Sequence, residues 1–340
     1  MNTTTYGLDI AKRVFHLYWV EAETGEIGSR RFGKQALIEF LSQRKPGQVA
    51  LEACGSAHWW ARRIASLGHE VKLLHAKFVR PFVQTNKTDA ADAHAIWTAA
   101  QQPAMRTVEP KTEDQQAVLS LHRMRALLVK MRTMQVNQLR GLLYEYGTHF
   151  KTGRRAGLAE IRQHLDQIEQ VVPGCLFDPM RDQLSRIDDL DKQIAGLERQ
   201  LTDCQKRQVD CQTVAAIPGI GMLTATALVA TVGDAKAFKS GRELAAFLGL
   251  VPRQTGTGGK VRLGGISKRG DVYLRTLLIH GARTVLFRSK EKGIWCDRLR
   301  QRRPTNVAAV AIANKMVRTA WALLVHGTAF EKNHVSVRPA

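Results

Sequence analysis

The stretch TTTYGLDIAKRVFHLYWVEAETGEIGSRRF, residues 3–32, decides the fold of the first part of the chain. Three runs within it have the residue pattern of β-strands: Thr3–Ile10, Val14–Ala22 and Ile27–Phe32, with a turn at Thr24-Gly25. Such strands, joined by short connections, are typical of a meander in which each strand pairs with the next.

The pattern after the meander alternates between helix and strand. Helices are expected over Ala36–Arg44, His58–Leu67 and Thr88–Gln101, and short strands over Gln48–Ala53 and Glu70–His75. Three strands followed by helix, strand, helix, strand and helix is the order of a ribonuclease-H-like α/β domain. We therefore predict such a domain for residues 1–105.

Positive charge is the main global feature of the sequence. The 340-residue chain carries 51 Lys and Arg against 30 Asp and Glu, a net charge of +21. A field of this sign attracts polyanions, and counterion release supplies most of the non-specific affinity for nucleic acid. A basic protein of the membrane surface is the alternative, but no long amphipathic Lys-rich helix with a Trp or Phe face is present. Nucleic acid is the expected partner.

Other global features indicate where the protein works. No apolar run approaches the roughly 20 residues needed to span a bilayer. The first residues, MNTTTYGLDI, lack the charged and apolar segments of a secretory signal. The five cysteines are scattered without a CxxC pair, which argues against a disulfide framework or a zinc module. We expect a cytoplasmic protein with no membrane partner.

Two long helical patterns follow the first domain. They cover Glu113 to about Gly147 and Pro179 to about Val209, and Pro173-Gly174 separates them. The second pattern has an apolar seam with alternating steps of three and four residues, which is typical of a coiled coil. Residues 106–209 are predicted to form a helical arm, and the sequence leaves open whether the arm dimerises or is a simple intramolecular hairpin.

Residues 210–330 have a different composition, first small and Gly-rich and then densely basic. We predict a second, mainly helical domain here. Its sequence Ala216-Ile217-Pro218-Gly219-Ile220-Gly221 precedes a helix of small residues, as in a helix-hairpin-helix unit. In such a unit Gly219 and Gly221 would let backbone amides approach a DNA phosphate. The alternative is a Gly-containing turn between packed helices.

Four acidic residues are candidates for a metal site. In TNKTDAADAHA, residues 85–95, Asp89 and Asp92 lie about one helical turn apart on the same face. Asp9 ends the first predicted strand and Glu52 the fourth, so all four carboxylates are expected to converge. Divalent cations relieve the repulsion in such a cluster, and two of them can clamp the reacting oxygens of a phosphodiester. The alternative is four solvated surface acids.

A second candidate site is the stretch LGLVPRQTGTGGKVRLGGISKRGDVYLRTLLIHGAR, residues 248–283. Its glycines and hydroxyls are interleaved with Arg253, Lys260, Arg262, Lys268, Arg269 and Arg275. Cations beside a hydroxyl nucleophile stabilise the charge that develops during attack on a phosphate. The alternative is a loop that only grips phosphates. The basic run Arg298–Arg303 is also expected to bind nucleic acid, either RNA or DNA.

Together these motifs resemble the IS110/IS1111 family of insertion-sequence transposases over nearly the whole chain. The strings that carry the resemblance are GLDIAK, LEACG, NKTDAADA, IPGIG and residues 248–283, the last most similar to the IS1111 branch. The resemblance implies a RuvC-like domain whose Asp-Glu-Asp-Asp tetrad falls on Asp9, Glu52, Asp89 and Asp92 and binds Mg²⁺. It also implies a transposase domain with a serine nucleophile that links covalently to DNA.

The resemblance further implies partners. Family members act in the bacterial cytoplasm, on nucleoid DNA, and recombine a donor and a target duplex. A structured RNA encoded beside the transposase gene directs them to both duplexes. Dimers of the protein associate into a tetramer. These expectations rest on the resemblance alone.

The sequence departs from the family at the nucleophile. The family's serine lies in a Ser-Gly pair five residues after the proline of a GL-x-P segment, and counting from Pro252 gives Thr257 followed by Gly258. Either Thr257 is the nucleophile, which we favour, or Ser267 takes that role, or this protein is impaired.

Two other functions fit the same residues. One is a metal-dependent, junction-resolving nuclease in which the acids hydrolyse DNA and the hydroxyl loop only grips it. The other is a non-catalytic nucleic-acid-binding protein with structural acids. A covalent protein–DNA adduct distinguishes the recombinase from both.

Overall fold

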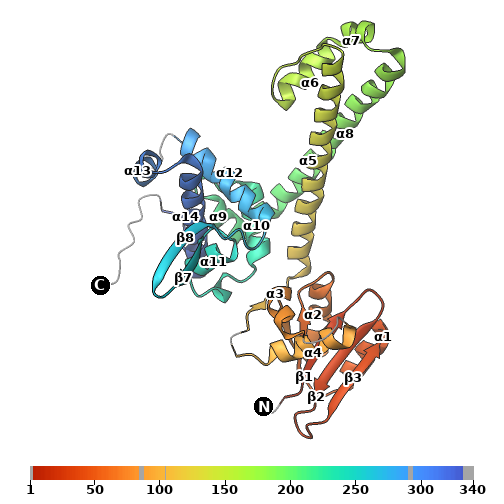
Figure 1. The fold of residues 1–340 in the computed structure, drawn as a ribbon, viewed down its shortest axis with the longest axis vertical. Helices are drawn as coiled ribbons and strands as arrows, with labels where there is room; N and C mark the ends of the chain where they lie inside the picture. Colours follow the sequence, from red (N-terminus) through yellow and green to blue (C-terminus); the bar gives the residue numbers. More distant parts are fainter. Residues whose placement is uncertain (1–2, 84–87, 104, 290–293, 332–340) are drawn as a thin grey trace. The chain divides into compact units, whose positions relative to one another are not determined.

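The chain folds as two compact units, Met1–Asp114 and Gln115–Ala340 (Figure 1). The computed structural model describes residues 3–83, 88–103, 105–289 and 294–331. Asn86 and Lys87 of the NKTDAADA motif lie outside the described residues. From residue 115 on, the segments predicted as the arm and as the basic domain belong to one unit, the second, whereas residues 106–114 of the predicted arm belong to the first.

A mixed β-sheet forms the centre of the first unit. Its strands lie in the order β3-β2-β1-β4-β5-β6. Their bounds are β1 Thr5–Ile10, β2 Phe15–Val20, β3 Ile27–Phe32, β4 Gln48–Glu52, β5 Glu70–Leu74 and β6 Thr107–Val108. The first three strands pair antiparallel, whereas β4 pairs parallel to β1 and β5 parallel to β4. The predicted meander and the α/β order are confirmed.

Helices cover both faces of this sheet. They are α1 Lys34–Ser42, α2 Ala57–Ala65, α3 Ala76–Val79, the 3₁₀ turn η1 Arg80–Phe82 and α4 Asp89–Ala100. Leu8, Leu17 and Leu51 pack into one core with the apolar residues of α1 and α2. Ala50, on the opposite face, packs with α4. The sequence did not predict α3, η1 or β6, because elements this short show no periodicity.

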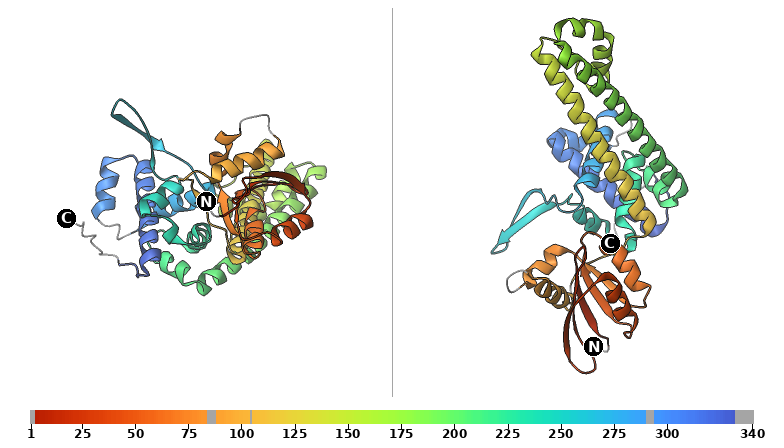
Figure 2. Two further views of the ribbon diagram at one scale, coloured as in Figure 1. Left: turned by 90° about the horizontal axis from the view of Figure 1, so that it is seen from below. Right: turned by 90° about the vertical axis from the view of Figure 1, so that its right-hand side faces the viewer.

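The arm consists of two long helices that pack within one chain. They are α5 Glu113–Glu145 and α8 Gly174–Arg207, joined through α6 Arg154–Gln163 and α7 Leu165–Val171 (Figure 2). Buried residues of all four helices share one cluster, and Gln183 of α8 donates to the backbone oxygen of Gln135 of α5 at 2.9 Å. The apolar seam of α8 therefore packs against other helices of the same chain. Helix α8 begins earlier than predicted, because Pro173 is its N-cap and Pro179 lies inside it.

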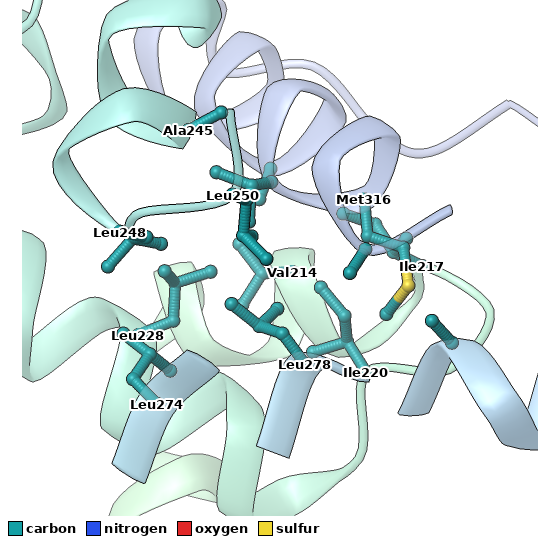
Figure 3. Packing of buried hydrophobic residues seen from close by; sticks show 14 of the residues in the cluster. Val214, Ile217, Ile220, Leu228, Ala245, Leu248, Leu250, Leu274, Leu278 and Met316 are labelled. Carbon is teal, nitrogen blue, oxygen red and sulfur yellow. The ribbon is translucent and has the colours of Figure 1, made fainter. Parts of the chain in front are cut away.

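Seven helices or helical turns and one hairpin complete the second unit within the described residues. They are α9 Val209–Ala215, α10 Met222–Val232, η2 Ala235–Ala237, α11 Gly241–Phe247, α12 Val272–Arg288, α13 Ile294–Arg302 and α14 Thr305–His326, with β7 Pro252–Thr257 paired to β8 Lys260–Ile266. Figure 3 shows Val214, Leu228 and Met316, from three of these helices, meeting in one core. The expectation of a mainly helical domain is confirmed.

Helix α14 is the one described helix long and apolar enough to cross a membrane. Of its apolar window, 44% is buried inside the protein. Ile312, Met316 and Val317 belong to the core shared with α10, α11 and α12. Its apolarity is explained by its position in the core of this unit.

A buried histidine joins α5 to the helices of the C-terminal core. His122 is 2% exposed; its Nε2 lies 2.9 Å from Thr226 Oγ1 and its Nδ1 3.0 Å from Tyr273 Oη. The Thr226 hydroxyl donates its proton to the Met222 carbonyl at 2.8 Å. Nε2 therefore carries the imidazole proton, and Nδ1 accepts from Tyr273. Burial, followed by the nearby Arg125, lowers the pKa of His122 from 6.5 to about 4.

This lowered pKa predicts acid sensitivity of the second unit. Between pH 6.5 and about 4 the unfolded chain binds the proton that the folded His122 rejects, so the free energy of unfolding falls as the pH falls. The loss is on the order of 3 kcal/mol at most. In His122→Gln an amide can keep both hydroxyl contacts without titrating. We expect calorimetric melting of this variant to depend less on pH than that of the wild type, and equal pH dependence would contradict the assignment.

Candidate active site

The four predicted acids lie on one face of the first sheet. Leu8 pairs with Leu51 in the parallel register, so Asp9 and Glu52 follow side by side on neighbouring strands. Because strand side chains alternate, both carboxylates lie on the α4 side of the sheet. Asp89 and Asp92 occupy the first turn of α4.

Helix α4 is held close to β1, where it brings its acids towards Asp9. Thr88 caps the helix by accepting a hydrogen bond from the Ala91 amide at 3.2 Å. A Cβ at Gly7 would clash with the Ala93 carbonyl and with Trp97. Only glycine permits this approach of helix to strand. GLDIAK thus contributes a packing residue as well as an acid.

The electrostatics of Asp9 show that the other three carboxylates act on it. Burial, then the charges of Asp92, Asp89 and Glu52, raise the pKa of Asp9 from 3.8 to about 6. A hard divalent cation would relieve this repulsion, and carboxylate oxygens are its preferred ligands. Among the described residues, however, no three acidic, His or Cys side chains are placed to enclose one ion. The donor set fits such a cation in chemistry and charge.

One residue beside the acids was missed by the sequence reasoning. His16 of β2 is the register partner of Asp9 and is 8% exposed. Its Nε2 lies 2.9 Å from Ser29 Oγ, while its Nδ1 is buried with no hydrogen-bond partner in the described chain. Burial lowers the pKa of His16. The sequence could have indicated His16, because the tight connection between the first two strands places Asp9 opposite His16.

The second candidate site is the β7–β8 hairpin, which no described helix of the second unit covers (Figures 1 and 2). Thr257 pairs with Lys260, and Thr255 with Arg262, so these four side chains share one face. All four residues are exposed. The turn between the strands is Gly258-Gly259, with φ of 56° and 78°. The hydroxyl groups and the cationic groups of the hairpin tip therefore lie on the same face.

The other predicted nucleophile, Ser267, lies at the base of the hairpin. Its amide donates to the Val251 carbonyl at 2.8 Å. Its Oγ is buried and has no hydrogen-bond partner in the described part of the chain. Thr257 is the more accessible of the two hydroxyls in this structure.

Arg275 does not fit the prediction that it holds a phosphate. The residue is only 7% exposed, and its Nη1 donates to the backbone oxygens of Leu248 at 3.1 Å and Arg269 at 2.8 Å. It ties together the two segments from which the hairpin emerges. These segments also touch through backbone at Gly249 and Gly270, where a Cβ would clash. The sequence pattern could not reveal this burial. A basic residue on α12 has the same neighbours in sequence whether its side chain points into the core or into solvent.

The remaining predicted phosphate contacts differ in exposure. Arg253, Lys268 and Arg269 lie exposed on or next to the hairpin. Gly219, with φ of 89°, is half-buried, and a Cβ there would press on the Gly281 carbonyl and Val285 of α12. Gly221 is exposed at the N-cap of α10. The close packing of the α9–α10 connection against α12 thus accounts for Gly219, whereas contact of Gly221 with DNA stays a prediction.

Comparison with known proteins identifies both parts of the chain. Residues 6–148 match the IS110-type DEDD transposase profile, described as "Transposase", and residues 211–294 match the profile "Transposase IS116/IS110/IS902 family". The acids fall in the first match and the hairpin in the second.

Full-length relatives agree with these matches. A probable family 20 transposase of Pseudomonas aeruginosa is 45% identical over 97% of this chain and 99% of its own length. The transposase for insertion sequence element IS1328 of Yersinia enterocolitica is 40% identical over 97% and 99%. The transposase for IS1111A of Coxiella burnetii is 40% identical over 94% and 88%. The chain belongs to the IS110/IS1111 family of transposases, enzymes of DNA recombination whose DEDD domain indicates dependence on a divalent metal.

Proposed function

We propose that this transposase cuts and joins DNA through a covalent intermediate on Thr257. The observation that carries the proposal is the hairpin face on which an exposed hydroxyl lies beside Lys260 and Arg262. Preorganised cations are most effective where charge develops in the transition state. The neighbouring cations Arg253, Lys268 and Arg269 would hold adjacent phosphates.

The proposed step is a transesterification. Thr257 Oγ attacks a backbone phosphorus, the bond from phosphorus to the 3′-oxygen breaks, and a Thr257–O–5′-phosphate ester forms. The hydroxyl loses its proton and the leaving 3′-oxygen gains one, so the step consumes no net proton. A 3′-hydroxyl of the partner duplex then attacks the ester and releases Thr257. Because the ester conserves the bond, no ATP is required, and the sequence has no Walker GxxxxGK[ST] loop.

The acids have a separate proposed role. Asp9, Glu52, Asp89 and Asp92 would together hold Mg²⁺, which stabilises charge on phosphate and leaving oxygens when bound. What supports this assignment is the raised pKa of Asp9 within the cluster of like charges. A hydrolytic, junction-resolving nuclease is the second candidate function, because all four acids lie within the first unit and need no hydroxyl from the hairpin.

We also propose that a structured RNA guides the protein and that the protein acts on nucleoid DNA. The net charge of +21 is sufficient to attract both nucleic acids. The basic run Arg298–Arg303 forms the exposed end of α13 and its following turn, and is available to either.

An exposed apolar stripe on α5 of the arm supports dimerisation. Met124, Leu127, Met131 and Met134 of α5 are 55%, 58%, 41% and 60% exposed. Their spacing of three, four and three residues is that of a coiled-coil seam. This stripe lies apart from the α5 residues buried against α8. We propose that it pairs with the stripe of a second copy, and that dimers assemble into a tetramer on DNA.

The double variant Leu127→Glu/Met131→Glu tests the dimer. Burying two like charges on each chain is expected to shift the protein to monomers and to abolish recombination. Light scattering after size-exclusion chromatography measures the mass. Val171→Glu/Val209→Glu is the matched control, since both valines are exposed apolar residues outside the stripe. Equal masses for the two double variants would contradict the assigned interface.

Adduct formation is the test of the function as a whole. Purified protein, the RNA flanking its gene, Mg²⁺ and a labelled duplex spanning the element's junction are incubated, and the products are run on a denaturing gel. The recombinase predicts label that migrates with the protein and is released by protease. Free cleaved ends without adduct would establish the nuclease instead, and an intact duplex that is merely bound would leave only the binding function.

A further inference from the structure

The arm contains a cavity of about 600 Å³ between α5, α6 and α8. Its charged lining consists of five arginines, Arg125, Arg132, Arg154, Arg155 and Arg162, and two acids, Asp191 and Glu198. Ligand sites of proteins usually measure about 300–1,000 Å³. The cavity is thus large enough for a ligand, and cations dominate its lining.

The ion pairs inside the cavity do not use all of its guanidinium groups. Asp191 accepts from both Arg132 and Arg154, at 2.5 and 2.6 Å, so one carboxylate serves two cations. Arg132 Nε is buried and has no hydrogen-bond partner in the described residues. Arg125 donates from Nε to Glu198 at 2.8 Å. Arg162, also in the lining, pairs with Asp188 at 2.5 Å, whereas Arg155 forms no ion pair among the described residues. Three carboxylates therefore face five guanidinium groups, so the cavity keeps a surplus of positive charge although its partly buried arginines are paired.

Arginine also suits one class of ligand. A guanidinium presents its donors in a planar fork that matches the oxygens of a phosphate. Arg155 and Arg162 are exposed and lie on α6, whereas Arg132 and Arg154 are only partly exposed. A phosphate entering from the surface would meet the exposed pair first and then the surplus donors inside.

We propose that this cavity binds a backbone phosphate of nucleic acid, as a contact separate from the acids and the hairpin. The inference rests on the proposed function only in that nucleic acid is the partner. The same phosphodiester chemistry is offered by the DNA substrate and by a structured RNA, so the test contains both.

The test compares two double variants of the full-length protein. Arg155→Gln/Arg162→Gln removes two exposed cavity arginines, whereas Arg181→Gln/Arg199→Gln removes two exposed arginines of α8 outside the cavity. Fluorescence anisotropy measures binding to a mixed-sequence DNA duplex and to a folded RNA hairpin over a series of salt concentrations. We expect the cavity variant to bind at least one probe about tenfold more weakly than the control. Its plot of log affinity against log salt should be flatter by about 0.9 per lost duplex phosphate contact.

A footprint locates the contact. Phenylglyoxal modification of the wild type, read by mass spectrometry, is expected to show protection of Arg155 by the probe whose binding falls, with no protection of Arg181. Equal affinities and salt slopes for the two variants on both probes, with Arg155 unprotected, would overturn the inference. In that case intact binding and adduct formation by the wild type would leave the proposed function standing, whereas a wild type that binds neither probe would overturn both.

Discussion

Thr257→Ala is expected to abolish the protein–DNA adduct and to lower recombination by about 1,000-fold or more, as loss of a nucleophile does in other enzymes with covalent intermediates. The change removes one exposed hydroxyl from the hairpin and leaves Lys260 and Arg262 in place. DNA binding should therefore change little. Gel analysis of adduct and of joined product, with anisotropy for binding, measures the three quantities separately.

Two further variants decide between the candidate hydroxyls. Thr257→Ser keeps the nucleophile and removes only a methyl group, so activity should persist. Ser267→Ala should leave the adduct intact, because Ser267 Oγ is buried at the base of the hairpin. An adduct that survives in Thr257→Ala and disappears in Ser267→Ala would assign the chemistry to Ser267 and require the hairpin to rearrange. Absence of adduct in the wild type on an active element junction would refute the covalent mechanism.

In the first unit, local sequence patterns predict most of the fold. Strand alternation predicted the meander and the later strands, with Asp9 and Glu52 near the ends of two of them, and the helical pattern placed Asp89 and Asp92 one turn apart, since each of these depends on local periodicity. Gly7 depends on a neighbour distant in sequence, whereas His16 depends on a partner just across the connection between β1 and β2. The need for glycine at position 7 is set by the backbone of α4, and the importance of His16 by its pairing with Asp9. The role of Gly7 is not visible without the packing of α4 on β1, whereas that of His16 follows once the first two strands are paired across their short connection.

The second unit shows where sequence reasoning fails. Arg275 and Arg262 are both basic residues in a Gly-rich region, but the first is buried against carbonyl oxygens and the second is exposed on the hairpin. Composition cannot separate them, because a guanidinium satisfies backbone carbonyls as well as phosphates. The cavity of the arm was missed for a related reason. Arg125, Arg132 and Arg154 come from two helices, and only their packing against α8 gathers them.

The acids of the first unit are expected to lower the stability of the protein in the absence of metal. The pKa of Asp9, raised from 3.8 to about 6, means that the folded state binds a proton more tightly than the unfolded state. Stability contributed by this group is therefore present at low pH and lost as the pH rises through about 6. At pH 7 the four carboxylates repel one another.

Asp92→Asn is consequently expected to abolish recombination while making the metal-free protein more stable. Asp92 contributes the largest charge effect on the pKa of Asp9, so its removal should raise the free energy of unfolding at pH 7 by about 1 kcal/mol. Calorimetry in EDTA measures this gain, and addition of Mg²⁺ should stabilise the wild type more than the variant, because bound metal favours the folded state. Glu26→Gln is the matched control, since Glu26 is exposed at the opposite end of the β1–β2 pair. Full recombination by Asp92→Asn would refute the metal site. Loss of both activity and stability would instead assign Asp92 a structural role.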